Sequence, residues 1–237
     1  MTSLTAQDIQ EVGEALGPLV TEIMFVGGCS LILYAGENFR DEFRPTLDID
    51  AILNVSTYTS LFEFEKKLVS CGFKRACGRG DPICRWKLGG ITFDLMPAKH
   101  VDGFVVNRWY EEAIAKPQSV MLANGNIINV IDPGYFLATK IEAFLSRGKL
   151  EGLSNSEVSV DLAANKDLED IVLLLDLKAT DFKSLQLNLS PKAYDFVRDF
   201  FGRMDKLDYM RDFISRCLSF DLNDLRTDRI LKMLKSY

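Results

Sequence analysis

Residues 27–50 read GGCSLILYAGENFRDEFRPTLDID, and this stretch decides how the first half of the chain is interpreted. It begins with Gly27-Gly28 and ends with two aspartates, Asp48 and Asp50, set one residue apart among apolar residues. That alternation predicts a strand, and side chains two residues apart on a strand point to the same face. Two adjacent carboxylates in a core need a cation between them. Because hard oxygen ligands suit Mg²⁺, the stretch predicts a metal site.

The composition sets broad limits on the class of protein. The 237 residues are enough for one large domain or two small ones, and 47% apolar and 26% charged residues are ordinary for a globular chain. The sequence contains no run of eighteen apolar residues and no basic-then-apolar leader, so we expect a cytoplasmic protein without a membrane partner. Five cysteines without C-x₂₋₄-C spacing indicate free thiols in a reducing compartment rather than a zinc site.

The charge pattern bears on nucleic-acid binding. A net charge of −6 argues against a surface that is basic throughout. Residues 74–87 nevertheless read KRACGRGDPICRWK, with five cations against one acid. This segment is compatible with contacts to an RNA backbone, and equally with a solvated loop.

Hydrophobic periodicity predicts an α+β fold whose second half is helical. We expect a helix capped by Ser3 or Thr5 and a strand at 22–26. A short helix-like stretch at 30–36 and a helix at 58–70 follow. Further strands are expected at 83–88 and 91–96 across the Gly89-Gly90 turn, and at 119–122 and 127–131. Helices are expected at 133–147, 167–178, 191–203, 206–218 and 222–235, with a linker at 148–165. These elements predict an α/β domain at 1–131 and a helical domain at 132–237 that closes an active-site cleft.

A third aspartate completes the pattern in the first domain. Asp94 lies in the apolar strand 91–96, where Phe93 and Leu95 point to the face opposite to it. A Gly-Gly pair, an Asp-x-Asp strand and a third Asp on a later strand resemble the nucleotidyltransferase superfamily related to DNA polymerase β. The segments FVGG, RPTLDID, FDLMP, LATKIEAFLSRGK and KDLEDIVLLL resemble one branch, the AbiEii-type nucleotidyltransferase toxins that include the MenT toxins. The resemblance covers about residues 22–178.

The resemblance implies a reaction and roles for the residues. The chain would transfer a nucleoside monophosphate from a nucleoside triphosphate, with two Mg²⁺ ions, or Mn²⁺ in their place, held by Asp48, Asp50 and Asp94. Gly27 and Gly28 would let backbone N–H groups approach the phosphates at the start of the following helix. Ser30 would add a hydroxyl contact.

The helical half contributes candidate cations and acids. Lys140 and Arg147 lie on one flank of the apolar stripe of the helix 133–147, from which both could reach triphosphate oxygens. The resemblance implies that Lys140 is functional. It also implies that one acid of the helix 167–178 serves the site. We favour Asp167, on the flank of the apolar stripe, over Asp170, which we place nearer the opposite side.

The acceptor stays open at this stage. The resemblance implies an RNA acceptor, plausibly the 3′ end of tRNA, a role as a toxin that blocks translation, and a cognate antitoxin protein as partner. The alternatives are a small molecule such as an aminoglycoside, a protein hydroxyl, a non-catalytic nucleotide-binding regulatory module, or a kinase.

Overall fold

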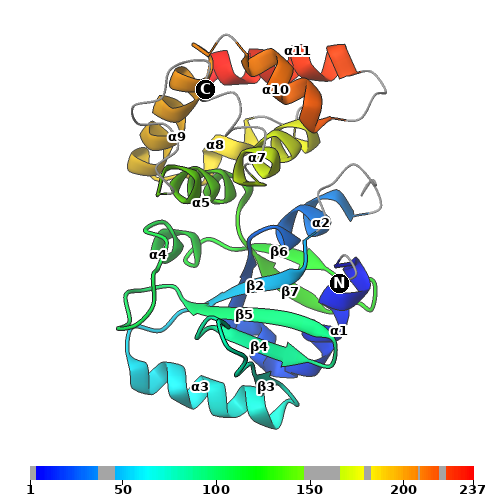
Figure 1. Ribbon diagram of the computed structural model, residues 1–237, viewed down its shortest axis with the longest axis vertical. Coiled ribbons are helices and arrows are strands. Elements are labelled where there is room, and N and C mark those ends of the chain that lie inside the picture. Colours follow the sequence, from blue (N-terminus) through cyan, green and yellow to red (C-terminus); the bar gives the residue numbers. More distant parts are fainter. Residues whose placement is uncertain (1–3, 37–45, 147–165, 179–182, 208, 219–222) are drawn as a thin grey trace. The chain divides into compact units, whose positions relative to one another are not determined.

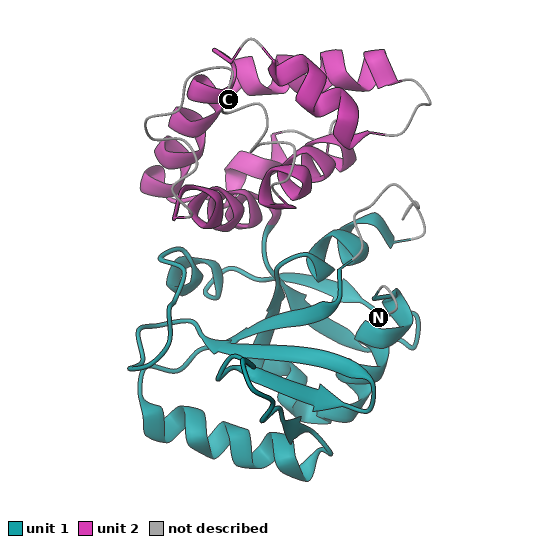
Figure 2. Ribbon diagram, in the orientation of Figure 1, with its two compact units in different colours: residues 1–36, 45–132 teal, residues 37–44, 133–237 magenta. Residues whose placement is uncertain are grey.

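The computed structural model describes residues 4–36, 46–146, 166–178, 183–207, 209–218 and 223–237 (Figure 1). The chain divides into two compact units, which Figure 2 colours separately. Among the described residues, unit 1 comprises 4–36 and 46–132, and unit 2 comprises those from Pro133 onward. The expected α+β class is confirmed, because a mixed sheet with flanking helices precedes a helical half.

Unit 1 is built on a seven-stranded mixed sheet with the order β3-β4-β5-β2-β1-β7-β6. Its strands are β1 (Ile23–Val26), β2 (Asp48–Leu53), β3 (Lys74–Arg75), β4 (Arg85–Leu88), β5 (Ile91–Pro97), β6 (Gln118–Met121) and β7 (Ile127–Val130). The pairs β2–β5 and β1–β7 are parallel, whereas the other neighbours are antiparallel. The Gly89-Gly90 hairpin joins β4 to β5, as the sequence predicts.

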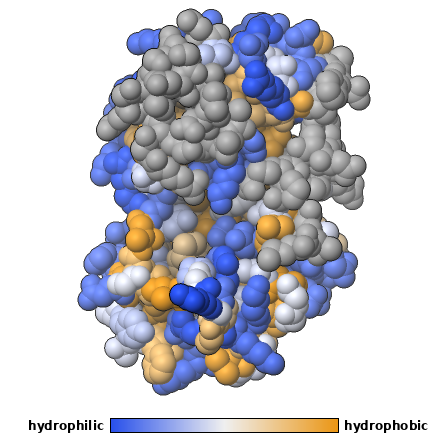
Figure 3. Space-filling model, in the orientation of Figure 1, coloured by the Kyte–Doolittle hydropathy of each residue, from blue (hydrophilic) through white to orange (hydrophobic). Residues whose placement is uncertain are grey.

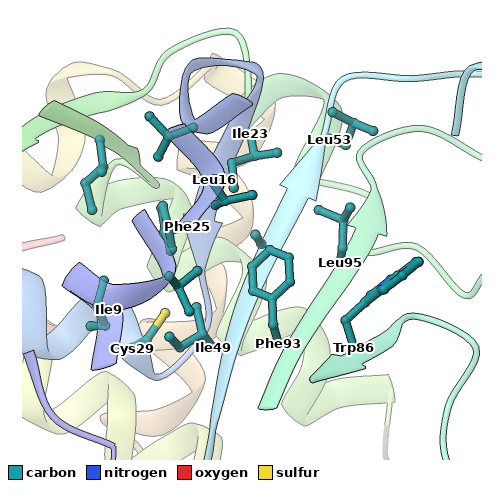
Figure 4. Packing of buried hydrophobic residues seen from close by; sticks show 14 of the residues in the cluster. Ile9, Leu16, Ile23, Phe25, Cys29, Ile49, Leu53, Trp86, Phe93 and Leu95 are labelled. Atoms are coloured by element: carbon teal, nitrogen blue, oxygen red, sulfur yellow. The ribbon is translucent and has the colours of Figure 1, made fainter. Parts of the chain in front are cut away.

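One face of this sheet carries the core of unit 1. Ile49, Phe93 and Leu95 lie in a buried cluster with apolar residues of α1 (Ala6–Leu16), such as Ile9 and Leu16 (Figure 4). The cluster also includes apolar residues of α3 (Tyr58–Ser70). Because strand side chains alternate, the aspartates at even-numbered positions of β2 and β5 are directed to the opposite face. Burial of one face therefore decides on which face the carboxylates gather.

Short elements complete unit 1. Thr5 caps α1, with its side chain and that of Asp8 forming a reciprocal capping box, so Thr5 rather than Ser3 is the cap. A 3₁₀ helix (Gly17–Glu22) leads into β1, and the remaining helices are α2 (Cys29–Ala35) and α4 (Tyr110–Ala113).

Unit 2 is helical throughout its described part. Its helices are α5 (Pro133–Ser146), α7 (Lys166–Leu177), α8 (Ser184–Leu187), α9 (Pro191–Met204), α10 (Met210–Cys217) and α11 (Asn223–Ser236). The helix α10 is shorter than the expected 206–218, because the chain turns after α9 through bonds such as Leu207 N–H to Met204 C=O. The expected linker at 148–165 lies outside the described residues.

The core of unit 2 is apolar and closely packed. Phe144 of α5 meets Phe200 of α9 edge to face, with ring centroids 5.9 Å apart. A cavity of about 20 Å³ between α7, α9, α10 and α11 is lined only by apolar side chains. Arg226 of α11 forms a two-pronged ion pair with Asp176 of α7, at 3.1 and 2.7 Å.

The surface mixes polar and apolar side chains. Figure 3 shows apolar residues interspersed with hydrophilic ones on the visible face. None of the helices within the described ranges is long and apolar enough to cross a membrane.

Candidate functional site

The Gly-Gly turn after β1 lies directly against one carboxylate. Gly27 has a backbone φ of +69°, a conformation that residues other than glycine rarely adopt. A Cβ atom placed on Gly27 would lie 2.2 Å from Oδ2 of Asp50 and 2.9 Å from its Cγ. The absence of a side chain at Gly27 therefore makes the space that the Asp50 carboxylate occupies.

The three aspartates share one face of two neighbouring strands. Asp48 and Asp50 are two residues apart on β2, and Asp50 is the register partner of Asp94 on the parallel strand β5. Asp48 has Thr92 as its partner in the same ladder. Asp94 is buried, whereas Asp48 and Asp50 are partly exposed. This register places Asp48 and Asp50 on one face of β2, as the sequence predicts. It places Asp94 on the same face of the sheet, opposite to Phe93 and Leu95.

A guanidinium group that we did not single out from the sequence completes this face. Arg85 lies opposite Asp94 in the antiparallel β4–β5 ladder. Its Nε donates to Asp94 Oδ1 at 2.9 Å and its Nη2 donates to Asp94 Oδ2 at 2.7 Å. The same Nη2 lies 3.5 Å from Oδ2 of Asp48. One cation thus connects two of the three carboxylates, in the geometry of a strong two-pronged pair.

Ionisation at this face follows from these contacts. The hydrogen bonds to Asp94 raise the pKa of Arg85 above its usual range, so this side chain stays charged at any ordinary pH. Burial, and then the negative charge of Asp94, raise the pKa of the Cys84 thiol to about 11. Cys84 is therefore a neutral thiol beside the carboxylates at neutral pH.

The helix after Gly28, α2, is short, and the side chains of its first turn are buried. Ser30 is fully buried, and its backbone N–H donates to Gly27 C=O at 3.2 Å. Four residues on, the Tyr34 hydroxyl donates to the carbonyl of Ile131, and burial raises the pKa of Tyr34 well above its usual value. A contact of Gly28 or Ser30 with a nucleotide stays a prediction.

A second charged cluster lies within unit 2. Lys140 Nζ of α5 is 2.6 Å from Oδ2 of Asp170 and 3.6 Å from Oδ1 of Asp167, both on α7. The Asp167 and Asp170 side chains are 3% and 2% exposed, and that of Lys140 is 12% exposed. Lys140 thus meets two buried carboxylates of its own unit, whereas the contact with triphosphate oxygens expected from the sequence stays a prediction.

The position of Asp170 corrects the sequence prediction. We placed it nearer the side of the helix opposite the apolar stripe, but residues three apart on a helix share a face, and Asp167 and Asp170 are both buried beside Lys140. Asp170 is the closer of the two to the lysine. Arg147 lies outside the described residues.

The basic segment 74–87 is largely engaged within the sheet. Arg75 pairs with Glu65 and lies over the Trp86 ring at 4.7 Å. Lys87 donates to the Thr92 hydroxyl at 2.5 Å. With Arg85 on Asp94, three of the five cations of this segment bond to neighbouring residues of unit 1.

The donor set is of the kind that binds Mg²⁺. Three carboxylates on one face offer hard oxygen ligands, and Gly27 leaves Asp50 room that any other residue would fill. Among the residues that the structure describes, no group of three acidic, histidine or cysteine side chains is close enough to hold an ion as it stands. In this arrangement the positively charged guanidinium of Arg85 pairs with the Asp94 carboxylate. The residues thus fit a divalent ion in type, and the charge of Arg85 lies beside two of the three carboxylates.

The chain was compared with known proteins. No family model matches it, and neither does any curated protein. Among solved structures, it is similar to the antibiotic-resistance factor ANT(2'')-Ia, with 12% identity, a TM-score of 0.44, and 84% of this chain and 94% of that one covered. It is also similar to an antigenic nucleotidyltransferase-like protein from Paracoccidioides brasiliensis, with 17% identity, a TM-score of 0.43, and 83% and 95% covered.

Proposed function

We propose that this protein is a divalent-cation-dependent nucleotidyltransferase of the superfamily related to DNA polymerase β. The observation that supports this proposal best is the placement of Asp48, Asp50 and Asp94 on one face of two parallel strands, with Gly27 against Asp50. Carboxylates on rigid strands hold ligands in a defined geometry. Such a set is what the transfer of a nucleotide from a triphosphate requires.

Asp48, Asp50 and Asp94 would hold Mg²⁺, with two ions in the active form and Mn²⁺ as a substitute. The ions supply charge neutralisation at the triphosphate and activation of the attacking oxygen. The protein itself contributes the positions of the carboxylates. Gly27 sets the position of Asp50, and the paired strands set the separation of Asp50 from Asp94.

We further propose that the cluster in unit 2 serves the same reaction. Lys140 would contact the triphosphate, and Asp167 and Asp170 would hold it charged and oriented. The shorter distance from Lys140 to Asp170 than to Asp167 supports Asp170 as a positioning residue beside Asp167. The assignment of Lys140 to the site rests on the resemblance of LATKIEAFLSRGK and KDLEDIVLLL to the AbiEii-type toxins.

For the acceptor we propose an RNA, with the 3′ end of tRNA as the first candidate. The same resemblance supports a role as the toxin of a toxin–antitoxin pair, acting in the cytoplasm and restrained by a cognate antitoxin. Modification of the tRNA 3′ end would block aminoacylation and therefore translation.

The test is incubation of the purified protein with Mg²⁺, each α-labelled nucleoside triphosphate and total tRNA. We expect label on tRNA with the wild type, and its loss in Asp48→Asn and Asp50→Asn. Asp102→Asn is the matched control, because this acid is fully exposed and lies outside the carboxylate face.

The acceptors are separated by where the label appears. In parallel incubations that contain an aminoglycoside or a protein acceptor in place of tRNA, label on that acceptor, with none on tRNA, would replace the RNA proposal with another acceptor. Transfer of a γ-label in place of the α-label would make the protein a kinase. Triphosphate binding without any transfer would make it a regulatory module.

A further inference from the structure

Arg85 engages both oxygens of the aspartate that the proposed metal site needs. Its two donors reach Oδ1 and Oδ2 of Asp94, which leaves neither oxygen without a charged partner. The Asp94 side chain is 8% exposed, against 37% for Asp48. A divalent ion that binds to Asp94 would therefore meet the guanidinium charge beside both of its ligand oxygens, and the two cations would repel each other.

The guanidinium also brings a positive charge to this face. It lies 3.5 Å from Asp48 and is hydrogen-bonded to Asp94, so it lowers the negative potential that would attract a cation to either. Lys87 lies on the same strand two residues away, but its ammonium donates to the uncharged Thr92 hydroxyl. The two cations of β4 thus differ in whether their partner is a carboxylate.

The guanidinium of Arg85 is not the group that holds β4 in the sheet. The side chain is 26% exposed, and its position in β4 is set by backbone pairing with β5 rather than by the guanidinium. A long side chain with an exposed portion can change rotamer while the backbone stays paired. The contact therefore has the properties of an exchangeable counter-ion.

We infer that Arg85 and a divalent cation compete for Asp94, so that Arg85 is a built-in counter-charge which holds the carboxylate face together until metal binds. This inference deepens the proposed function and rests on it for the identity of the ion. It makes Arg85 a positioning residue whose removal strengthens metal binding. A residue that only stabilised the fold would not have that effect.

The test is Mn²⁺ binding, followed by electron paramagnetic resonance, to the full chain without nucleotide. We expect Arg85→Gln to lower the dissociation constant for Mn²⁺ about tenfold, because a positive charge in contact with the ligands is removed. Lys87→Gln is the matched control, with the same change of charge on the same strand, and we expect it to change the constant less than about threefold.

A second measurement covers the stability of the variant. Arg85→Gln leaves the Asp94 carboxylate buried without its partner, so its melting temperature should fall below that of the wild type. Mn²⁺ should raise the melting temperature of Arg85→Gln by more than that of the wild type, because the ion takes over the role of the guanidinium.

Two results would overturn the inference. The first is a dissociation constant for Mn²⁺ that is as large in Arg85→Gln as in Lys87→Gln, or larger. The second is a melting temperature of Arg85→Gln that Mn²⁺ raises no more than it raises that of the wild type. Nucleotide transfer by the wild type is measured separately. If the wild type transfers nucleotide but Arg85→Gln does not bind Mn²⁺ more tightly, only this inference about Arg85 is wrong. If Arg85→Gln binds Mn²⁺ more tightly but the wild type transfers nucleotide to no acceptor, only the proposed nucleotidyltransferase activity is wrong.

Discussion

Replacement of Gly27 by alanine adds one methyl group at the centre of the carboxylate face. The new Cβ would lie 2.2 Å from Oδ2, 2.9 Å from Cγ and 3.0 Å from Cβ of Asp50. These separations are too short for unbonded atoms. The backbone of Asp50 is held in the β1–β2 ladder opposite Val26, so its side chain has to rotate away from the methyl group.

The size of the effect can be worked from these contacts. Adopting a φ of +69° costs an alanine about 1–2 kcal/mol relative to glycine. Displacement of a catalytic group by about 1 Å typically lowers the rate about 100-fold. We therefore expect Gly27→Ala to fold with a melting temperature roughly 3–8 °C lower. We also expect kcat/KM for nucleotide transfer to fall about 100-fold.

A matched glycine separates strain from displacement. Gly89 also has a positive φ, of +54°, and a Cβ there would meet nothing within 4 Å. Gly89→Ala should therefore lose stability as Gly27→Ala does, but keep its activity and its affinity for Mn²⁺. The measurements are thermal unfolding, Mn²⁺ titration and transfer of an α-labelled nucleotide. A folded Gly27→Ala protein that binds Mn²⁺ and transfers nucleotide like Gly89→Ala would refute the reasoning.

Three further predictions concern other parts of the chain. Lys140→Met removes the cation from two buried carboxylates and should lower the free energy of unfolding by about 3–5 kcal/mol in urea titrations at pH 7; the additional change Asp170→Asn should recover part of that loss, and no recovery would contradict the pairing. The Cys84 thiol, with its pKa raised from 9.0 to about 11, should resist iodoacetamide at pH 8 in peptide mass spectrometry; its protonated form stabilises the fold fully below pH 9, and that contribution is lost as the pH rises through about 11. Thr5→Ala should lower the free energy of unfolding by about 1 kcal/mol through loss of the capping box, and an unchanged urea midpoint would exclude it.

Much of the carboxylate face could be predicted because it depends on local order in the chain. The spacing of Asp48 and Asp50 on a strand determines that they share a face, whatever the strand pairs with. The alternation around Asp94 places it opposite the core residue Phe93, and the structure agrees. Arg85 was within reach of the same reasoning, since counting outward from the Gly89-Gly90 turn puts it opposite Asp94.

The cluster around Lys140 shows what was harder to predict. Whether Asp167 or Asp170 meets the lysine depends on how α7 is rotated against α5, which the apolar run of α7 leaves open because nearly all of its faces are buried. The structure brings both acids to Lys140, with Asp170 closer. A helix that is apolar on all sides carries little information about its own orientation.

The short elements β3, α4 and α8 were not predicted from the sequence. The sequence alone determined most of the longer strands and helices, the hairpin, and the shared face of Asp48 and Asp50. It could do so because each depends on periodicity or turn residues within a few positions of the chain. Only the tertiary structure decided that β5 pairs in parallel with β2, which brings Asp94 beside Asp50, and that Gly27 makes room for the Asp50 carboxylate. Those features depend on contacts between segments more than twenty residues apart, and such contacts are selected by packing of the whole unit rather than by local preference.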